Sequence, residues 1–451
     1  MRVRKAVALG AALSLAALLS ACSSDSGNGS GSSSGTLNWW TWDDKQAAAY
    51  QVCAKDFEKA NPGVTVKITQ YNVTDYFTKL TAGFVAGKAP DAFQNSVQFF
   101  PQYADQHQLL PLDDYIKKDG FDLSRFSVGV DSWKYTDGKQ YGLPLDWAAT
   151  GLYYNVDMLK KAGYTTKDVE NLNWNPDNGG TIGKMIAHLT LDTNGRRGDQ
   201  PGFDKAHIKT YGFGQLAAKD FLGQSTWSSF VSTTGWRLGN KANWPTELNY
   251  DDARLVKTMD WIRTLVAKGF APRIGTFTNT VSDVDLLSSG KIAMETGGSW
   301  SASTFAKIPN IKVGIGPTVL GPDGKTRAVF SNSNGNTIWA GTKNPDLAWK
   351  WVSYMGSEAC QTKASATGTF FPSIPASMDA SAKALEAQGV DLSVFTDMLK
   401  NKQLYPSPDF NNGAELQDAI EPMIEAYFGG QKDDSVFAEM QAKTKTILNK
   451  K

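Results

Sequence analysis

Strand and helix signals alternate along this chain, and the alternation limits what it can fold into. Residues 36–42 are β-branched and aromatic, as strands commonly are. Apolar side chains then recur at helical spacing over residues 45–60, and an Asn-Pro-Gly turn at 61–63 ends the run. Alternating valine and isoleucine at 64–68 predict a second strand. A strand–helix–strand unit of about 30 residues implies a parallel sheet.

The same patterns continue to the end of the chain. At 451 residues, 41% of them hydrophobic and 20% charged, the chain is long and apolar enough for two or three domains, and it is not disordered. We therefore expect an α/β fold with more than one lobe. Further elements are predicted as short strands over 91–93 and 292–294, and as helices over 76–86, 251–268, 345–356 and 414–428, the last bent at Pro422.

The first residues have the pattern of an export signal. A basic start at residues 2–5 is followed by an apolar run over residues 6–19 that is shorter than the roughly 20 residues needed to span a bilayer. Leu19-Ser20-Ala21-Cys22 resembles a bacterial lipobox, in which Cys22 becomes the lipid-bearing first residue. Residues 1–21 are then a signal peptide. The alternative is an ordinary signal peptide with a chance cysteine.

The stretch after Cys22 indicates a tether. Residues 23–35 hold seven serines and four glycines, a composition typical of flexible linkers. Residues 22–35 would thus hold a folded protein away from the membrane to which the lipid anchors it. We expect the protein to be exported and lipid-anchored at the extracellular face of the cell membrane.

Charge and metal-ligand content exclude several classes of protein. Cleavage after residue 21 removes three of the 46 basic residues against 45 acidic ones, which leaves a formal net charge of −2. No nucleic-acid partner is expected at that charge. The three histidines are scattered and no cluster has metal-ligand spacing, so neither a metal nor another cofactor is expected.

Export also changes what the cysteines predict. With Cys22 carrying lipid, Cys53 and Cys360 remain. In an oxidising compartment two remaining cysteines are expected to form a disulfide. The alternative is two separate buried thiols.

A set of short segments gives the chain a family resemblance. In their order along the chain they resemble the bacterial extracellular solute-binding proteins of sugar-importing ABC transporters, the family that includes the maltose-binding proteins. Each segment is weak alone, whereas the ordered set spans nearly the whole exported chain. The segments are Leu37–Asp43, Phe57–Gly63, Ala89–Phe93, Leu109–Leu112, Asp137–Pro144, Leu152–Asn155, Gly290–Trp300, Trp339–Pro345 and Ala348–Trp351.

This resemblance implies a two-lobed periplasmic-binding-protein fold of the class II type. The chain would cross the hinge more than once, and the ligand would lie in the cleft between the lobes. The amino-terminal lobe is expected at 36–146 plus 337–374 and the carboxyl-terminal lobe at 147–336 plus 375–451. Cys53 and Cys360 both fall in the amino-terminal lobe. We expect a monomer.

A neutral sugar is bound through two kinds of contact. Its C–H faces stack on aromatic rings, and its hydroxyls need aimed donors and acceptors. Trp42-Asp43, directly after the first strand, can supply both, and Asn95-Ser96 follows a later strand in the matching position. The alternatives are a tryptophan packed in the core and a simple turn.

Two further segments extend the predicted site. Asp146-Trp147 lies where the family's chain leads into the hinge, and Glu295–Trp300 forms a glycine-containing loop after the predicted strand at 292–294. The resemblance implies that Trp300 stacks on sugar, although a ring packed on its own lobe is the alternative. Weaker candidates are Trp227, Asn334 and Phe410, the last standing where relatives carry another aromatic residue.

The sequence therefore predicts a binding protein rather than an enzyme. It would capture a mono- or oligosaccharide between its lobes and deliver it to the permease of an ABC importer. One alternative keeps the fold and binds a non-sugar solute, such as a polyamine or a glycerol phosphate. Another is a surface glycoside hydrolase, for which Asp43, Asp146 and Glu295 would have to supply a pair of carboxyl groups at the required separation.

Overall fold

The computed structural model describes residues 35–277 and 282–450. The predicted signal peptide, the lipidation site Cys22 and nearly all of the serine- and glycine-rich tether lie outside these residues. Within them, every helix is too short or too polar to cross a bilayer.

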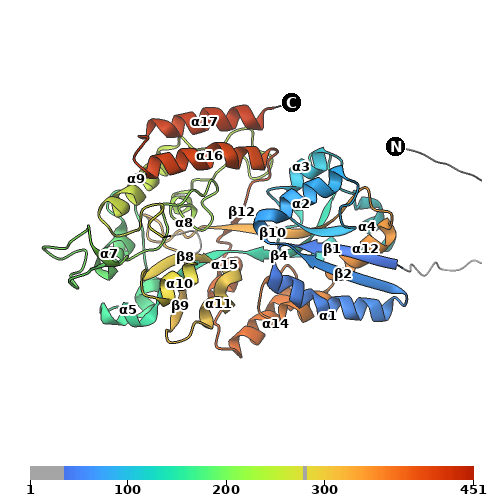
Figure 1. Cartoon of the computed structure of the whole chain (residues 1–451), viewed down its shortest axis with the longest axis horizontal. Helices are drawn as coiled ribbons and strands as arrows, with labels where there is room; N and C mark the ends of the chain where they lie inside the picture. The colour runs from blue at the N-terminus through green and yellow to red at the C-terminus, as the bar shows by residue number, and fades with distance from the viewer. Residues whose placement is uncertain (1–34, 278–281, 451) are drawn as a thin grey trace, which may run out of the picture.

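A seven-stranded mixed sheet organises the amino-terminal lobe (Figure 1). Its first three strands in the chain are parallel to one another, and β10 and β4 are added antiparallel at one side. The spatial order is β2 (Val64–Gln70), β1 (Gly35–Thr41), β3 (Ala92–Ser96), β10 (Val329–Ile338), β4 (Gly142–Ala148) and β11 (Phe371–Pro372), with β12 (Leu404–Pro406) paired to the start of β10.

A smaller antiparallel sheet lies in the other lobe. Its central strand β5 (Thr150–Asn155) pairs with β8 (Met294–Gly298) and β9 (Val313–Gly316). Only Ala149 separates β4 from β5, so the chain passes from one sheet to the other almost without a connection. A two-stranded sheet, β6 (Leu191–Asp192) and β7 (Ile208–Thr210), lies apart from both.

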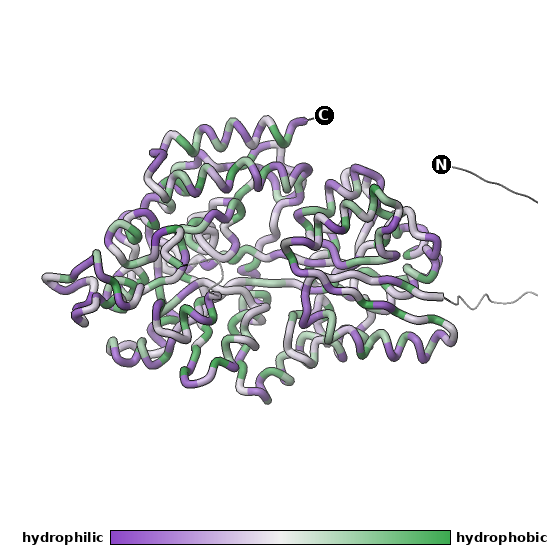
Figure 2. Tube along the Cα trace, in the orientation of Figure 1, coloured by the Kyte–Doolittle hydropathy of each residue, from purple (hydrophilic) through white to green (hydrophobic). Residues whose placement is uncertain are grey.

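Helices surround both sheets. The amphipathic pattern is visible in Figure 2, where hydrophilic and hydrophobic residues alternate along α16 and α17. The helices are α1 (Asp44–Ala60), α2 (Val73–Val85), α3 (Phe100–Asp105), α4 (Asp113–Asp119), α5 (Val156–Lys161), α6 (Thr166–Glu170), α7 (Gly180–Leu189), α8 (Ser228–Val231), α9 (Ala253–Ala267), α10 (Asp283–Ser288), α11 (Ala302–Ala306), α12 (Pro345–Met355), α13 (Glu358–Ser365), α14 (Pro375–Glu386), α15 (Ser393–Lys400), α16 (Gly413–Phe428) and α17 (Ser435–Leu448).

The two sheets are connected by more than the direct passage from β4 to β5, the two strands that we call the hinge strands. β10 runs from its pairing with β12 into its pairing with β3 and β4, and its register shifts at Asn334/Gly335. Helix α14 packs against α13 and β11 and shares an apolar cluster with α11 and α15, so it bridges the amino-terminal lobe and the smaller sheet. The division of the chain into lobes at 146/147, 336/337 and 374/375 stays a prediction.

Most elements expected from the sequence are confirmed, but two boundaries were wrong. Asn95-Ser96 lies inside β3 rather than after it, and β8 covers residues 294–298 rather than ending at 294. Asp146-Trp147, expected where the chain leads into the hinge, lies inside β4. The reason is strand pairing: Ser96 opposes Asn334, and Thr296 opposes Leu152, so polar residues that would read as loop are held in a sheet.

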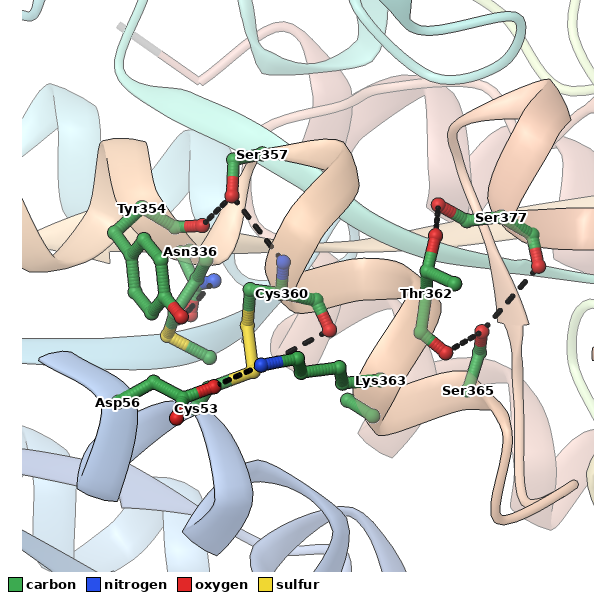
Figure 3. The surroundings of a disulfide bond; sticks show 12 residues. Cys53, Asp56, Asn336, Tyr354, Ser357, Cys360, Thr362, Lys363, Ser365 and Ser377 are labelled. Carbon is green, nitrogen blue, oxygen red and sulfur yellow. Dashed lines mark hydrogen bonds and ion pairs between the residues drawn. A yellow bond between two sulfur atoms is a disulfide. The ribbon is translucent and has the colours of Figure 1, made fainter. Parts of the chain in front are cut away.

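Cys53 and Cys360 form a disulfide, as the sequence predicts for an exported chain. The bond joins α1 to α13, and both sulfur-bearing residues are fully buried (Figure 3). Beside it, the ammonium group of Lys363 pairs with the carboxylate of Asp56, again between α13 and α1. The first and last helical segments of the lobe are therefore tied together across 307 residues of sequence.

We expect loss of this disulfide to destabilise the protein by about 2–5 kcal/mol, because the crosslink restricts the unfolded chain. Thermal and denaturant unfolding of the Cys53→Ala/Cys360→Ala double variant should show the loss. Reductant should lower the midpoint of the wild type and leave that of the double variant unchanged. Equal midpoints for oxidised wild type and double variant would contradict the prediction.

Candidate ligand-binding cleft

Asp43 caps α1, and the first turn of this helix lines the candidate cleft. One carboxylate oxygen of Asp43 accepts hydrogen bonds from the backbone amides of Lys45 and Gln46, both at 2.9 Å. Such a cap satisfies amides that would otherwise lack partners. Burial raises the pKa of Asp43 above its ordinary value, while the two amides act in the opposite direction. Asp43 thus has a structural role besides any contact with a ligand.

A buried carboxylate that lines the cleft links three elements, α1, β4 and β10, through hydrogen bonds. Asp146, on β4, is 3% exposed. It accepts a hydrogen bond at 2.6 Å from the side-chain amide of Gln46 on α1, and another at 2.9 Å from that of Asn334 on β10. Burial raises the pKa of Asp146 to about 6, although both amide donors oppose the shift. Gln94, on β3, extends the network by donating to Gln46 at 3.3 Å.

Two tryptophans from opposite lobes face the same cavity. Trp42 follows β1 and packs against Tyr76 and Phe77, with ring centroids 5.3 Å apart in each case. Trp300 lies in a 3-10 turn after β8 and is 39% exposed, unusual for so large an apolar side chain.

The indole of Trp300 is held over the backbone of Gly298. A Cβ added to Gly298 would stand 2.2 Å from ring atoms of Trp300, so only glycine permits this approach. One side of the ring therefore packs on the protein's own backbone. A partly exposed ring fixed in this way is free to stack on another molecule.

These groups line one cavity of about 640 Å³, within the usual range for small-molecule sites. Its walls combine aromatic rings, carboxylates and amides. Charges are few: Asp43, Asp44 and Asp146 are balanced in part by Lys45, and no arginine lines the cavity in the described part of the chain. The arrangement suits a neutral, hydroxyl-rich ligand better than an anion.

Seven of the ten predicted ligand-binding residues line this cavity: Trp42, Asp43, Ser96, Asp146, Trp147, Trp300 and Asn334. Trp147 does so as a buried wall, because its ring stacks on Phe371 at 4.9 Å and its indole N–H donates to the sulfur of Met378. The structure brings residues 42–43, 146–147, 300 and 334 together from four separate segments.

The other three predicted residues lie elsewhere. Trp227 is fully buried, packs on Trp236 and donates its indole N–H to the carbonyl of Asp220. Phe410 is 2% exposed and packs near Phe221 in the core of the carboxyl-terminal lobe. Asn95 is fully buried in β3, and the alternation along that strand brings Ser96 rather than Asn95 to the cavity.

Sequence reasoning missed several lining residues. Lys45 and Gln46 could have been found, because the second and third residues after a helix N-cap lie beside the cap, here Asp43. Others gave no local signal, since their strands and loops meet only in the folded chain. The missed residues include Lys45, Gln46, Gln70, Asn72, Gln98, Gln224, Asn332 and Phe370.

Comparison with known proteins places the chain in a family. A model of the bacterial extracellular solute-binding proteins matches residues 53–389. The chain belongs to this family. As an extracellular solute-binding protein it captures a ligand and is not an enzyme. Within its described residues, no group of three or more histidine, cysteine or carboxylate side chains is placed to hold a metal ion.

Relatives of this solute-binding protein include the maltodextrin-binding protein MdxE of Bacillus subtilis. The two are 26% identical over 390 residues, which cover 85% of this chain and 82% of MdxE. A maltooligosaccharide ABC transporter solute-binding lipoprotein of Streptococcus pneumoniae is 24% identical and aligns over 87% of this chain and 84% of its own length.

Solved structures share the fold. The Listeria monocytogenes substrate-binding protein Lmo0181, in complex with cycloalternan, superposes with a TM-score of 0.76 at 22% identity, covering 92% of this chain and 99% of that one. The sugar-binding protein MalE of Xanthomonas citri gives a TM-score of 0.70 at 20% identity, covering 92% and 97%. The two-lobed binding-protein fold predicted from the sequence is confirmed.

The buried carboxyl of Asp146 should make stability depend on pH. Its pKa in the folded protein, about 6, exceeds its ordinary value of 3.8, so the folded state binds the proton more tightly than the unfolded state. The stabilisation by protonation is present below about pH 4 and is lost as the pH rises through 6. Relative to Asp146→Asn, the free energy of unfolding of the wild type should fall by up to roughly 3 kcal/mol across this window.

Urea unfolding at a series of pH values measures this difference. The exposed neighbour Asp44 provides the control, because Asp44→Asn should keep the pH dependence of the wild type. If Asp146→Asn and the wild type respond to pH identically, Asp146 is not the group responsible.

Proposed function

We propose that this protein captures a neutral sugar, a mono- or oligosaccharide, between its lobes and delivers it to the permease of an ABC importer. The observation that carries the proposal is the cavity with Trp42 on one lobe and Trp300 on the other. The same cavity is lined by amide and carboxylate groups that can bind hydroxyls. The proposed ligand-binding set is the seven residues brought together there: Trp42, Asp43, Ser96, Asp146, Trp147, Trp300 and Asn334.

A polyamine fits this cavity less well than a sugar does. Asp146 already accepts two amide hydrogen bonds, and one oxygen of Asp43 accepts two backbone amides. Lys45 adds a positive charge to the same space. The carboxylates are thus partly satisfied by the protein, and a polycation would meet an ammonium group. A glycerol phosphate would meet three carboxylates and no arginine.

The names of the relatives support a sugar as the ligand and an ABC importer as the partner. MdxE is named for maltodextrin, and the pneumococcal relative is named a lipoprotein of a maltooligosaccharide ABC transporter. Ligand binding would favour closure, because only the closed form lets both lobes contact the ligand. The closed monomer, with lobes divided as the sequence predicts, would then dock on the permease.

The anchor belongs to the same proposal. Lipid on Cys22 would hold the protein at the extracellular face of the cell membrane, with residues 23–35 as the tether. Two signals are needed for stable anchoring, so the cysteine would carry more than one acyl chain.

Trp300→Ala should weaken sugar binding about tenfold or more, because it removes the exposed stacking surface. Intrinsic fluorescence and thermal shift of the purified protein against mono- and oligosaccharides, with polyamines and glycerophosphodiesters as controls, provide the measurement. Trp40→Phe is the matched control, since Trp40 packs on Tyr71 and does not line the cavity. A response to polyamine alone would overturn the choice of ligand.

Cys22→Ala should abolish incorporation of labelled palmitate in cells. The Cys53→Ala/Cys360→Ala variant should incorporate label as the wild type does, because those cysteines form the disulfide. Mass spectrometry of the wild-type amino terminus should find residue 22 as the first, acylated residue. Label that persists in Cys22→Ala would contradict the anchor.

A further inference from the structure

A second large cavity adjoins the cleft. It encloses about 840 Å³ and, like the first, has walls from both parts of the molecule. One wall comes from α10, α11 and the loop that follows α11. The other comes from Lys45 on α1 and from Thr367 and Thr369, in the segment between α13 and β11. Figure 1 shows α10 and α11 on the side of the smaller sheet and α1 on the side of the larger sheet, with α14 drawn between them.

Lys45 is the boundary between the two cavities, because it lines both. Its ammonium group donates a hydrogen bond at 2.5 Å to the hydroxyl of Thr304 on α11. The partition at this point therefore includes a hydrogen bond between side chains of the two lobes. A partly buried hydrogen bond of a flexible lysine contributes little net free energy once the ordering of its side chain is counted, so a ligand hydroxyl can replace it.

The chemistry of the second cavity differs from that of the first. Hydroxyl groups of Ser303, Thr304, Thr367 and Thr369 line it, and Ile308 and Ile311 add aliphatic surface. Among its described lining residues there is no aromatic ring. Lys307 and Asn310 also line it, and both residues are exposed. Such a wall can bind sugar hydroxyls but offers no ring for stacking.

We propose that the second cavity is an extension of the binding cleft, which receives the far end of an oligosaccharide whose near units stack on Trp300. The ligand would pass Lys45 and replace its bond to Thr304. The end units would be held by hydroxyls, Lys307 and Asn310 rather than by rings. This inference rests on the proposed function and narrows it, since the preferred ligand is then an oligosaccharide with more units than the first cavity alone accommodates.

The test is the dependence of affinity on chain length. Titration calorimetry of the purified protein would use one homologous series, from monosaccharide to heptasaccharide, of the sugar type that gives a response. The wild type should bind longer members more tightly until the second cavity is filled. Thr369→Phe, which fills that cavity from a half-buried position, should weaken the long members about tenfold and leave the shortest responding member nearly unchanged.

Two milder variants guard against misfolding of Thr369→Phe. Lys307→Ala and Asn310→Gly alter exposed side chains, and the positive φ of Asn310 is one that glycine adopts readily. Each should weaken long ligands and spare short ones, whereas Trp300→Ala should weaken all of them. Affinity that is independent of chain length, or variants that weaken every length equally, would overturn the extension while sparing the proposed function. Absence of binding to sugars of any length would overturn both.

Discussion

The cleft depends on one buried carboxylate. Asp146 lies on β4, and its oxygens accept hydrogen bonds from Gln46 on α1 and Asn334 on β10. An ionised carboxylate buried without such donors would be strongly unfavourable, so the three elements must stay in register for the group to be tolerated. The same contacts fix the first turn of α1, and with it Asp43 and Lys45, relative to the hinge strands. The hydrogen bonds of Asp146 thus position the polar groups of the cleft and also hold α1, β4 and β10 in place relative to one another.

The aromatic surfaces are fixed by a different means. Trp300 rests on the backbone of Gly298, and Trp42 rests on Tyr76 and Phe77. Each ring therefore gains its orientation from packing within its own lobe and keeps a surface for the cavity. The two rings come from different lobes, so a ligand that contacts both would stabilise one relative placement of the lobes. The hydrogen bond from Lys45 to Thr304 spans the same gap.

The fold was largely predictable, because local periodicity reports which residues are helical and which are extended. The helices at 45–60, 251–268 and 414–428 are confirmed to within a few residues. Which residues line the site was harder to predict from the sequence. Trp300 and Trp227 both have polar neighbours in the sequence. The first is partly exposed and the second is fully buried, and the sequence does not distinguish the two cases. Asn95 and Ser96 differ by one position on a strand, and that single step decides which of them reaches the cavity.

The amino-acid sequence was enough to predict the α/β class, the order of the elements, the disulfide between Cys53 and Cys360, and several of the segments that line the cleft. These follow from periodicity, from composition and from motifs read in order along the chain. Other features required the packing of the folded chain: the meeting of Gln46, Asp146 and Asn334, the burial of Phe410, and the second cavity lined by Lys45. The physical reason is that such contacts join residues up to hundreds of positions apart, and their distances are set by how whole strands and helices pack.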